Sequence, residues 1–159
     1  MQLIELTGIR GKNAFTMVDD IDFEYLNQWK WQLRHGYATR NKEIKGKYYH
    51  VFMHRLINKT PDGLFTDHIN LNKLDNRKTN LRNANKAQNS TNRIVRKDNT
   101  SGYKGVVWHN VGNGYWKAYI TIEKKHKHLG LFRDKIQAAT AYNEAAIKYF
   151  GQYARLNII

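Results

Sequence analysis

The most regular alternation of apolar and polar positions lies between residues 103 and 132. Three runs rich in β-branched and aromatic residues, at 103–109, 115–122 and 126–132, predict three strands. A Gly- and Asn-rich turn at 110–114 joins the first two runs, and a short charged turn at 123–125 joins the last two. Because tight turns join antiparallel neighbours, we expect a three-stranded antiparallel sheet.

The segment after residue 133 carries the signals of a helix. Asp134 is the expected N-cap, Gln137 stands at the capping-box position, and Gly151 is expected to end the helix. A helix this rich in alanine is slim enough to pack closely against a sheet, and its alanines are Ala138, Ala139, Ala141, Ala145 and Ala146. Residues 103–159 are therefore expected to form one domain, a sheet backed by a single helix.

Residues 1–53 have the pattern of a small β-rich module. The run 14–18 is a short apolar strand, and Asp20 is the expected cap of a short helix with Phe23 and Leu26 on one face. Residues 36–40 and 47–53 predict a hairpin around Gly46.

Two tryptophans, Trp29 and Trp31, lie on the same face of this module if their segment is extended. Base stacking is one use for them. The interpretation favoured here is that they form the core of a module that has few other large apolar groups.

Residues 54–96 contain little apolar material, and Asn occupies eight of the positions from 70 to 92. Asn favours loops and caps over helix interiors, so we expect mostly loop here, with a helix from near Asn83 or Asn85 to about Ile94. The polar residues 97–102 form the expected linker. The predicted organisation is 1–53, a β-rich module; 54–96, a catalytic core; 97–102, a linker; and 103–159, a binding domain.

The charge balance indicates what kind of partner the chain binds. The chain of 159 residues has 27 Lys and Arg against 13 Asp and Glu, a formal charge of +14. Net charge is +2 over residues 1–53, +6 over 54–96 and +6 over 97–159. A balance this basic favours a polyanion, and the last two segments are expected to face its phosphates.

Composition also excludes several classes. The chain has no Cys, which excludes disulfides and Cys-based zinc sites, so no zinc is expected. The N-terminus lacks a basic region followed by an apolar run, and no stretch reaches the roughly 18–20 apolar residues of a membrane span. We therefore expect a cytoplasmic protein, in the host-cell cytoplasm if a phage encodes it.

The candidate chemistry lies in an ordered set between residues 54 and 89. The set consists of His54, Arg55, Asp67, His68, Asn76, Asn80, Arg82 and Asn89. Phosphodiester hydrolysis needs a base for water, a cation and ligands for that cation. Asp67 and Asn89 supply the oxygen ligands that suit Mg²⁺ or Mn²⁺, and His68 is the expected general base.

Geometry constrains this hypothesis. Successive side chains in a strand point to opposite faces, so Asp67 and His68 share one site only if the chain bends there, at a strand end. Asn85 and Asn92 are alternative ligands on the same predicted helix, although the spacing favours Asn89.

Four motifs carry a resemblance to a known family: 54–57 (HRLI), 67–70 (DHIN), 75–77 (DNR) and 80–82 (NLR). The chain resembles HNH endonucleases, most closely the phage- and intron-associated homing type, whose fold is a ββα-metal finger. The resemblance implies that His68 is the base, that Asp67 and Asn89 bind the cation, and that Asn80 pins the loop and helps to orient the base. It makes Arg55 and Arg82 phosphate-facing or loop-bracing residues. Family members often have Asp-Gly-Asn after the Asp-His pair, and residues 69–72 lack that Gly.

Residues 101–157 resemble the APETALA-two (ethylene-response-factor) DNA-binding domain. The motifs are 101–106 (SGYKGV), 116–118 (WKA), 128–132 (HLGLF) and 153–157 (YARLN). That domain lays its sheet in the DNA major groove, which is wide enough for it. The candidate DNA-binding residues on the predicted sheet segment are Lys104, Trp108, His109, Trp116, Lys117, Tyr119, Lys124, His126 and His128. Packing against the helix is an equal alternative for the two tryptophans.

The sequence thus predicts an α+β chain that binds double-stranded DNA and hydrolyses it with a single cation. We expect a monomer with no membrane association and no obligate protein partner. Two alternatives stay open: a DNA-binding regulator that keeps the HNH frame without chemistry, and an RNA-binding basic protein.

Overall fold

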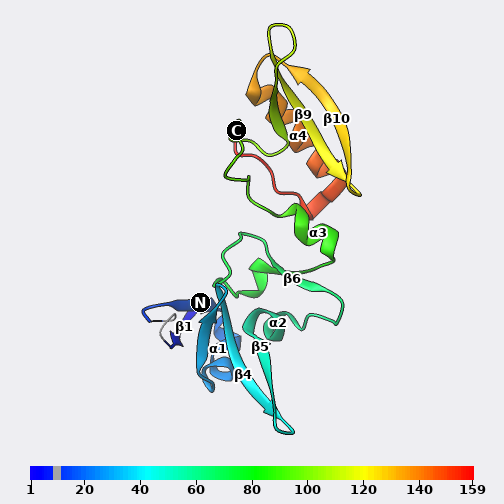
Figure 1. Ribbon diagram of the computed structural model, residues 1–159. Coiled ribbons are helices and arrows are strands. Elements are labelled where there is room, and N and C mark those ends of the chain that lie inside the picture. Colours follow the sequence, from blue (N-terminus) through cyan, green and yellow to red (C-terminus); the bar gives the residue numbers. More distant parts are fainter. Residues whose placement is uncertain (9–11) are drawn as a thin grey trace. The chain divides into compact units, whose positions relative to one another are not determined.

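A computed structural model of the chain describes residues 1–8 and 12–159 (Figure 1). The chain divides into two compact units, an N-terminal unit of Met1–Lys86 and a C-terminal unit of Ala87–Ile159. Both mix strands with short helices, so the predicted α+β class is confirmed. Residues 1–53 share their compact unit with residues 54–86, and the finer division into modules stays a prediction.

The N-terminal unit is built on a five-stranded sheet in the order β2-β1-β3-β4-β5. Its strands are β1 (Gln2–Thr7), β2 (Phe15–Val18), β3 (Trp31–Arg34), β4 (Tyr37–Ile44) and β5 (Lys47–Phe52). β1 and β3 run parallel, and the other neighbours are antiparallel. The predicted hairpin around Gly46 is confirmed as β4 and β5.

The two tryptophans of this unit belong to its core. Trp31 is fully buried and donates its indole N–H to the carbonyl of Leu26 at 2.9 Å. Trp29 packs against the same core, and the guanidinium of Arg40 lies 4.2 Å above its ring. The core interpretation is therefore confirmed over base stacking.

Helix α1 (Asp20–Asn27) corrects one expected cap. The N-cap is Asp19, which is extended at φ −74° and ψ 152°, and Asp20 is the first helical residue. The carboxylate of Asp20 instead accepts two hydrogen bonds from the N-terminal ammonium group, at 2.8 and 2.9 Å. Asp20 is one position too late to be the cap, and its carboxylate is bonded to the terminus instead of to the helix amides.

The rest of the N-terminal unit holds α2 (Met53–Asn58), β6 (Phe65–His68), a 3₁₀ turn η2 (Lys78–Asn80) and β7 (Leu81–Ala84). β6 and β7 form an antiparallel pair of their own. The loop between them bonds to β2, because the amide of Met17 donates to Leu74 at 2.8 Å and Asn76 donates back to Met17 at 2.8 Å. The five-stranded sheet thus anchors the β6–β7 loop.

The predicted helix in the Asn-rich segment exists and is shorter than expected. Helix α3 spans Lys86–Thr91, directly after Asn85, whereas Asn83 belongs to β7 and Ile94 lies beyond the helix. Asn83 pairs with Thr66 in the β6–β7 ladder, which fixes it as a strand residue.

The C-terminal unit has the predicted architecture. β8 (Val106–His109), β9 (Tyr115–Ile122) and β10 (Lys125–Phe132) form an antiparallel sheet in the order β10-β9-β8. Helix α4 (Lys135–Phe150) packs on this sheet, and a 3₁₀ turn η3 (Gly151–Tyr153) follows. Asp134 caps α4 by accepting from the amide of Ile136 at 2.8 Å.

The first strand of this sheet begins later than expected, at Val106 instead of Tyr103, so Lys104 is not a sheet residue. The reason is Gly105, which has φ +72°. A Cβ there would lie 2.1 Å from the ring of Tyr142 and 2.5 Å from the carbonyl oxygen of Tyr119. Only glycine allows the chain to turn this close to α4 and β9.

Among the described helices, none combines the length and the apolar character that crossing a bilayer requires.

Candidate active site

His68 is the last residue of β6 and is 95% buried, with 5% of its surface exposed. Its ring lies edge-on to His54, with 5.2 Å between centroids, and 6.0 Å from the ring of Tyr37. The ladder to β7, where His68 pairs with Leu81, fixes its backbone. Asp67 and His68 therefore lie at the end of a strand, which is the position that the shared-site hypothesis requires.

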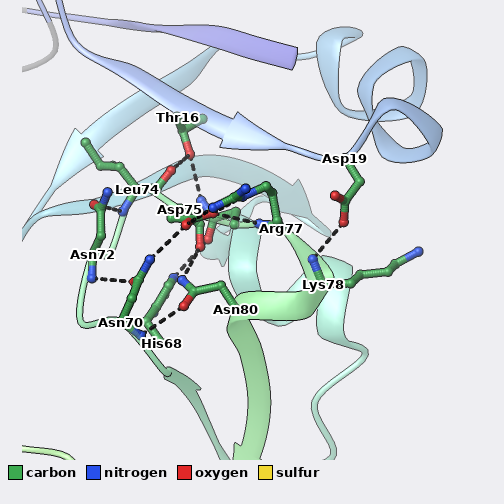
Figure 2. Close-up of polar contacts among 11 residues, drawn as sticks. Thr16, Asp19, His68, Asn70, Asn72, Leu74, Asp75, Arg77, Lys78 and Asn80 are labelled. Atoms are coloured by element: carbon green, nitrogen blue, oxygen red, sulfur yellow. Dashed lines mark hydrogen bonds and ion pairs between the residues drawn. The ribbon is translucent and has the colours of Figure 1, made fainter. Parts of the chain in front are cut away.

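A chain of hydrogen bonds fixes the proton on this ring (Figure 2). The Oγ1 hydroxyl of Thr16 donates to the carbonyl of Leu74 at 2.9 Å and so accepts from the Nδ2 of Asn76 at 2.7 Å. The Oδ1 of Asn76 then faces the Nε2 of His68 at 3.1 Å. Because that oxygen only accepts, Nε2 must carry the hydrogen, and the lone pair of the neutral ring is on Nδ1.

Burial keeps both histidines of this cluster neutral. Desolvation lowers the pKa of His68, against the opposing effects of the bond to Asn76 and of the charges of Asp67 and Asp75. Desolvation also lowers the pKa of His54 to about 3, with His68, Arg55 and Lys73 adding to the effect. A neutral imidazole at physiological pH is the form that accepts a proton.

His54 is the second residue of α2 and packs as a neutral ring behind His68. It lies 4.8 Å from the ring of Tyr37 and 5.5 Å from that of Phe52, between centroids. Within the described residues its Nδ1 is buried without a hydrogen-bond partner. Its contacts make it a wall of the site, which limits the positions that the His68 ring can take.

Asp67 is held by Arg82, its register partner across the β6–β7 ladder. The carboxylate Oδ2 accepts from Arg82 at 2.8 Å (Nε) and 2.6 Å (Nη2), and both side chains are largely buried. This two-point pairing limits the rotation of the carboxylate.

Arg55 braces a loop. Its guanidinium donates to three backbone carbonyls, those of Leu64 at 2.8 Å, Thr60 at 3.3 Å and Pro61 at 3.4 Å. Arg55 was expected either to face phosphate or to brace a loop, and these contacts are those of a loop-bracing residue.

Asn80 spans the β6–β7 loop from within. Its Oδ1 accepts from the amide of Asn70 at 2.9 Å, and its Nδ2 donates to the carbonyl of Asp75 at 2.8 Å (Figure 2). Its own carbonyl accepts from the amide of Ile69 at 2.9 Å. These bonds tie both ends of the loop to one buried side chain.

The missing glycine of the loop has a structural counterpart at Leu71. This residue has φ +69°, a left-handed conformation that L side chains rarely adopt. Side-chain caps hold it there: Asn70 Oδ1 accepts from the amide of Asn72 at 2.8 Å, and Asn72 Oδ1 accepts from that of Leu74 at 3.1 Å. The loop keeps the turn that a glycine favours, although a leucine occupies it.

The sequence reasoning assigned no role to two residues that hold the site, Asp75, which it quoted only within the 75–77 motif, and Thr16. Asp75 is almost fully buried, receives two bonds from the guanidinium of Arg77 at 2.7 and 2.6 Å, and has its pKa lowered mainly by them. Thr16 is also fully buried. Its signal was a hydroxyl at a buried position of an otherwise apolar strand, and its partners lie about sixty residues away.

The predicted cation ligands fall on different units. Asp67 belongs to the N-terminal unit, and Asn89, on α3, belongs to the C-terminal unit. Of the two alternatives, Asn85 precedes α3 and Asn92 follows it in a buried position. Across the described chain, no three His, Cys, Asp or Glu side chains gather into a metal-binding group. A site made of one Asp and one Asn is not a group of that kind.

The C-terminal sheet places the predicted DNA-contacting residues on two faces. A hollow of about 290 Å³ on its outer face is lined by Val107, Lys117, Tyr119, His126 and His128. Register puts His109 on this outer face too, whereas Lys124 is in the turn before β10. Trp108 and Trp116 are register partners on the helix-facing side, where Trp116 packs into the core and Trp108 stays 48% exposed. Of the two interpretations for the tryptophans, packing against the helix therefore applies to Trp116.

An Asp-His pair at the end of a strand, a central Asn before the next strand and a short helix after it define a ββα-type nuclease site. The family model of the HNH endonucleases matches residues 48–91, the segment that carries this site. The chain is 32% identical to an uncharacterized HNH endonuclease of Acanthamoeba polyphaga mimivirus, over 94% of its own length and 78% of the relative. It is 35% identical to Protein 3.8 of Escherichia phage T7, over 60% of its own length and 77% of that protein. The chain belongs to the HNH endonuclease family.

Proposed function

We propose that the protein is a metal-dependent endonuclease that hydrolyses phosphodiester bonds of double-stranded DNA. The observation that carries this proposal is the state of His68. It is a buried, neutral imidazole whose Nε2–H is directed at Asn76, which leaves Nδ1 as the basic nitrogen. A neutral imidazole with a fixed tautomer is suited to take a proton from water.

The neighbours of His68 support both of its protonation states. When Nδ1 takes a proton from the attacking water, the new positive charge is stabilised by the bond to Asn76 and by the carboxylates of Asp67 and Asp75, which oppose the effect of burial. The ring of His54 restricts rotation of the base. Proton transfer from a positioned base contributes about 10²–10⁴-fold to a rate.

Asp67 would supply a carboxylate oxygen to the divalent cation, and the family resemblance implies an amide oxygen from Asn89 as a second ligand. Hard oxygen donors of this kind suit Mg²⁺ or Mn²⁺. The fit is supported on the Asp67 side, where Arg82 holds the carboxylate in one orientation. When bound, such an ion neutralises the charge that develops on the phosphate. By the family resemblance, the products carry 5′-phosphate and 3′-hydroxyl ends.

The C-terminal unit would hold the duplex with the outer face of its sheet. Lys117, Tyr119, His126 and His128 line one hollow there, and the ring of Tyr119 stacks edge-on against His126 at 5.1 Å. Residues 97–159 carry a net charge of +6, which favours the phosphate backbone. The general form, a sheet in the major groove, follows from the APETALA-two resemblance.

The test is cleavage of supercoiled plasmid and phage DNA with Mg²⁺ or Mn²⁺, with EDTA as the metal-free control. His68→Ala is expected to lower the cleavage rate about 10²–10⁴-fold while DNA affinity stays close to wild type. His50→Ala is the matched control, since His50 is an exposed histidine of β5 that bonds to Asn41 and Arg34. Wild-type cleavage by His68→Ala would overturn the mechanism. Binding without cleavage at every ion concentration would favour the regulator.

A further inference from the structure

A second hollow in the C-terminal unit lies away from the outer face of the sheet. It has a volume of about 250 Å³ and forms where three segments meet, at 93–95, 102–104 and 155–158. Three of its lining residues are cationic: Arg93, Lys104 and Arg155. The other lining residues are neutral, so no carboxylate balances the three charges within the hollow.

The charges of Arg93 and Arg155 act on Lys104, which lines the same hollow. Its pKa is lowered to about 8, first by burial and then by the charges of Arg155 and Arg93. Among the described residues, none of the three forms an ion pair with Asp or Glu. Like charges that converge in a partly buried place are unfavourable unless an anion neutralises them.

The walls of the hollow are held in place before any ligand arrives. The Lys104 ammonium donates to the carbonyls of Thr91 and Arg93. The backbone amide of Lys104 donates to Asn157 Oδ1 at 2.7 Å, and Asn157 Nδ2 donates to the backbone carbonyl of Lys104 at 3.1 Å. Asn157 is in turn bonded through its backbone to Asn143 on α4, at 2.7 and 3.0 Å. The three segments that carry the cations are therefore cross-linked by polar contacts.

We propose that this hollow binds one backbone phosphate of the DNA duplex. Its volume is below the roughly 300–1,000 Å³ of pockets that take drug-sized molecules, so a single phosphate with part of its sugar is the ligand of matching size. Two guanidinium groups and one ammonium group supply the charge, and guanidinium groups bind phosphate oxygens in pairs. The site rests on the proposed function for its partner and adds a contact separate from the sheet face.

The salt dependence of DNA affinity tests this site. Binding of the full-length protein to duplex DNA is measured in EDTA, so that no cleavage occurs, across a series of salt concentrations. Each phosphate contact contributes about 0.9 to the slope of log K against log salt. Arg155→Gln is expected to reduce that slope by about 0.9 and to weaken binding several-fold for every duplex sequence, and Arg155→Lys is expected to restore most of the slope.

Arg96→Gln is the matched control, because Arg96 is an arginine outside the lining of the hollow, is 85% exposed and already pairs with Asp98 at 2.8 Å. Its slope is expected to equal that of wild type. An unchanged slope in Arg155→Gln, or an equal loss in Arg96→Gln, would overturn the site. Saturable shifts of the Gly102 and Asn157 amides with inorganic phosphate, combined with an unchanged DNA slope, would make it a free-phosphate site and overturn the duplex assignment.

Failure of this site and failure of the proposed function give different results. A protein that binds DNA with the expected slope change but never cleaves would retain the phosphate site and lose the nuclease assignment. A protein that cleaves through His68, while Arg155→Gln keeps the wild-type slope, would lose only the phosphate site.

Discussion

The interiors of the two units are built from different chemistry. In the C-terminal unit, the core is apolar: Val106, Ala118, Ala138 and Ala139 fill the space between sheet and helix. The N-terminal unit adds to its apolar core around Trp31 a buried polar network around His68. Eight of the ten buried polar residues identified in the described chain belong to this unit: Thr16, Thr39, His54, Asp67, His68, Asp75, Asn76 and Asn80.

This difference shows what each unit is organised to do. Close apolar packing makes a rigid platform whose outer face is free to bind. A buried polar network fixes the orientation and protonation of particular side chains, at the risk that any unpaired member is costly. Changes to the C-terminal core should therefore act on stability, whereas changes to the His68 network should act on rate.

The largest expected effect is in the C-terminal core. Gly105→Ala places a Cβ 2.1 Å from the Tyr142 ring at a residue with φ +72°. Overpacking and the left-handed conformation together are expected to lower the free energy of unfolding of this unit by about 2–5 kcal/mol. Hydrogen exchange followed by mass spectrometry measures this as lost amide protection in β8, β9 and α4.

Gly102→Ala separates the two causes. Gly102 has φ +78°, but a Cβ added there would meet nothing within 4 Å, so only the backbone cost, about 1–2 kcal/mol, is expected. Equal losses in the two variants would show that packing against Tyr142 does not control this core. If Gly105→Ala lowered amide protection around His68 as much as in β8, β9 and α4, the effect of the substitution would not be confined to the C-terminal core.

A smaller effect on stability, with a distinct effect on rate, is expected at Thr16. Thr16→Val keeps the shape but removes the oxygen acceptor of Asn76 Nδ2 and leaves only the weak acceptor Met53 Sδ at 3.7 Å, so the amide can turn and select the other tautomer of His68. Stability is expected to fall by about 1–3 kcal/mol for the unsatisfied amide. The cleavage rate is expected to fall by roughly tenfold or more, up to the full contribution of a general base.

The pH profile distinguishes this from a general loss of structure. The Asn76 bond raises the pKa of His68, so its loss lowers that pKa further. Because cleavage is lost as pH falls through the pKa of the base, the acid limb should move to lower pH in Thr16→Val. Thr16→Ser keeps the hydroxyl and should behave like wild type. A rate loss with an unmoved limb would place Thr16 outside the control of His68.

The same contrast explains what the sequence could predict. Alternation, turn residues and caps are local signals, so the C-terminal sheet, its turns, the Asp134 cap and the β4–β5 hairpin could all be predicted from sequence. Errors arose where a tertiary contact decided the outcome. Lys104 left the sheet because Gly105 packs against Tyr142, and the carboxylate of Asp20 is bonded to the N-terminal ammonium group instead of to the helix amides.

For the site, the motif order led to the proposal of His68 and Asp67, but the network around them was not predictable. Thr16 reaches Asn76 across about sixty residues, and no local pattern encodes such a contact. The Leu71 conformation was also hidden, since a leucine gives no signal for φ +69°. Both depend on the backbone bonds that attach the β6–β7 loop to β2.

The smallest expected effect concerns this loop. Leu71→Gly removes the Cβ from a left-handed residue, which relieves about 1 kcal/mol of strain but adds freedom to the unfolded chain, so we expect a net change within roughly 0.5 kcal/mol and an unchanged cleavage rate. Leu71→Ala keeps the strain and loses the same side chain. Thermal unfolding should therefore find the Gly variant at least as stable as the Ala variant, although glycine is ordinarily the less stable of the two. The reverse order would show that Leu71 does not occupy the glycine position of the HNH loop. The left-handed Leu71 would then no longer explain how the loop keeps its shape without that glycine.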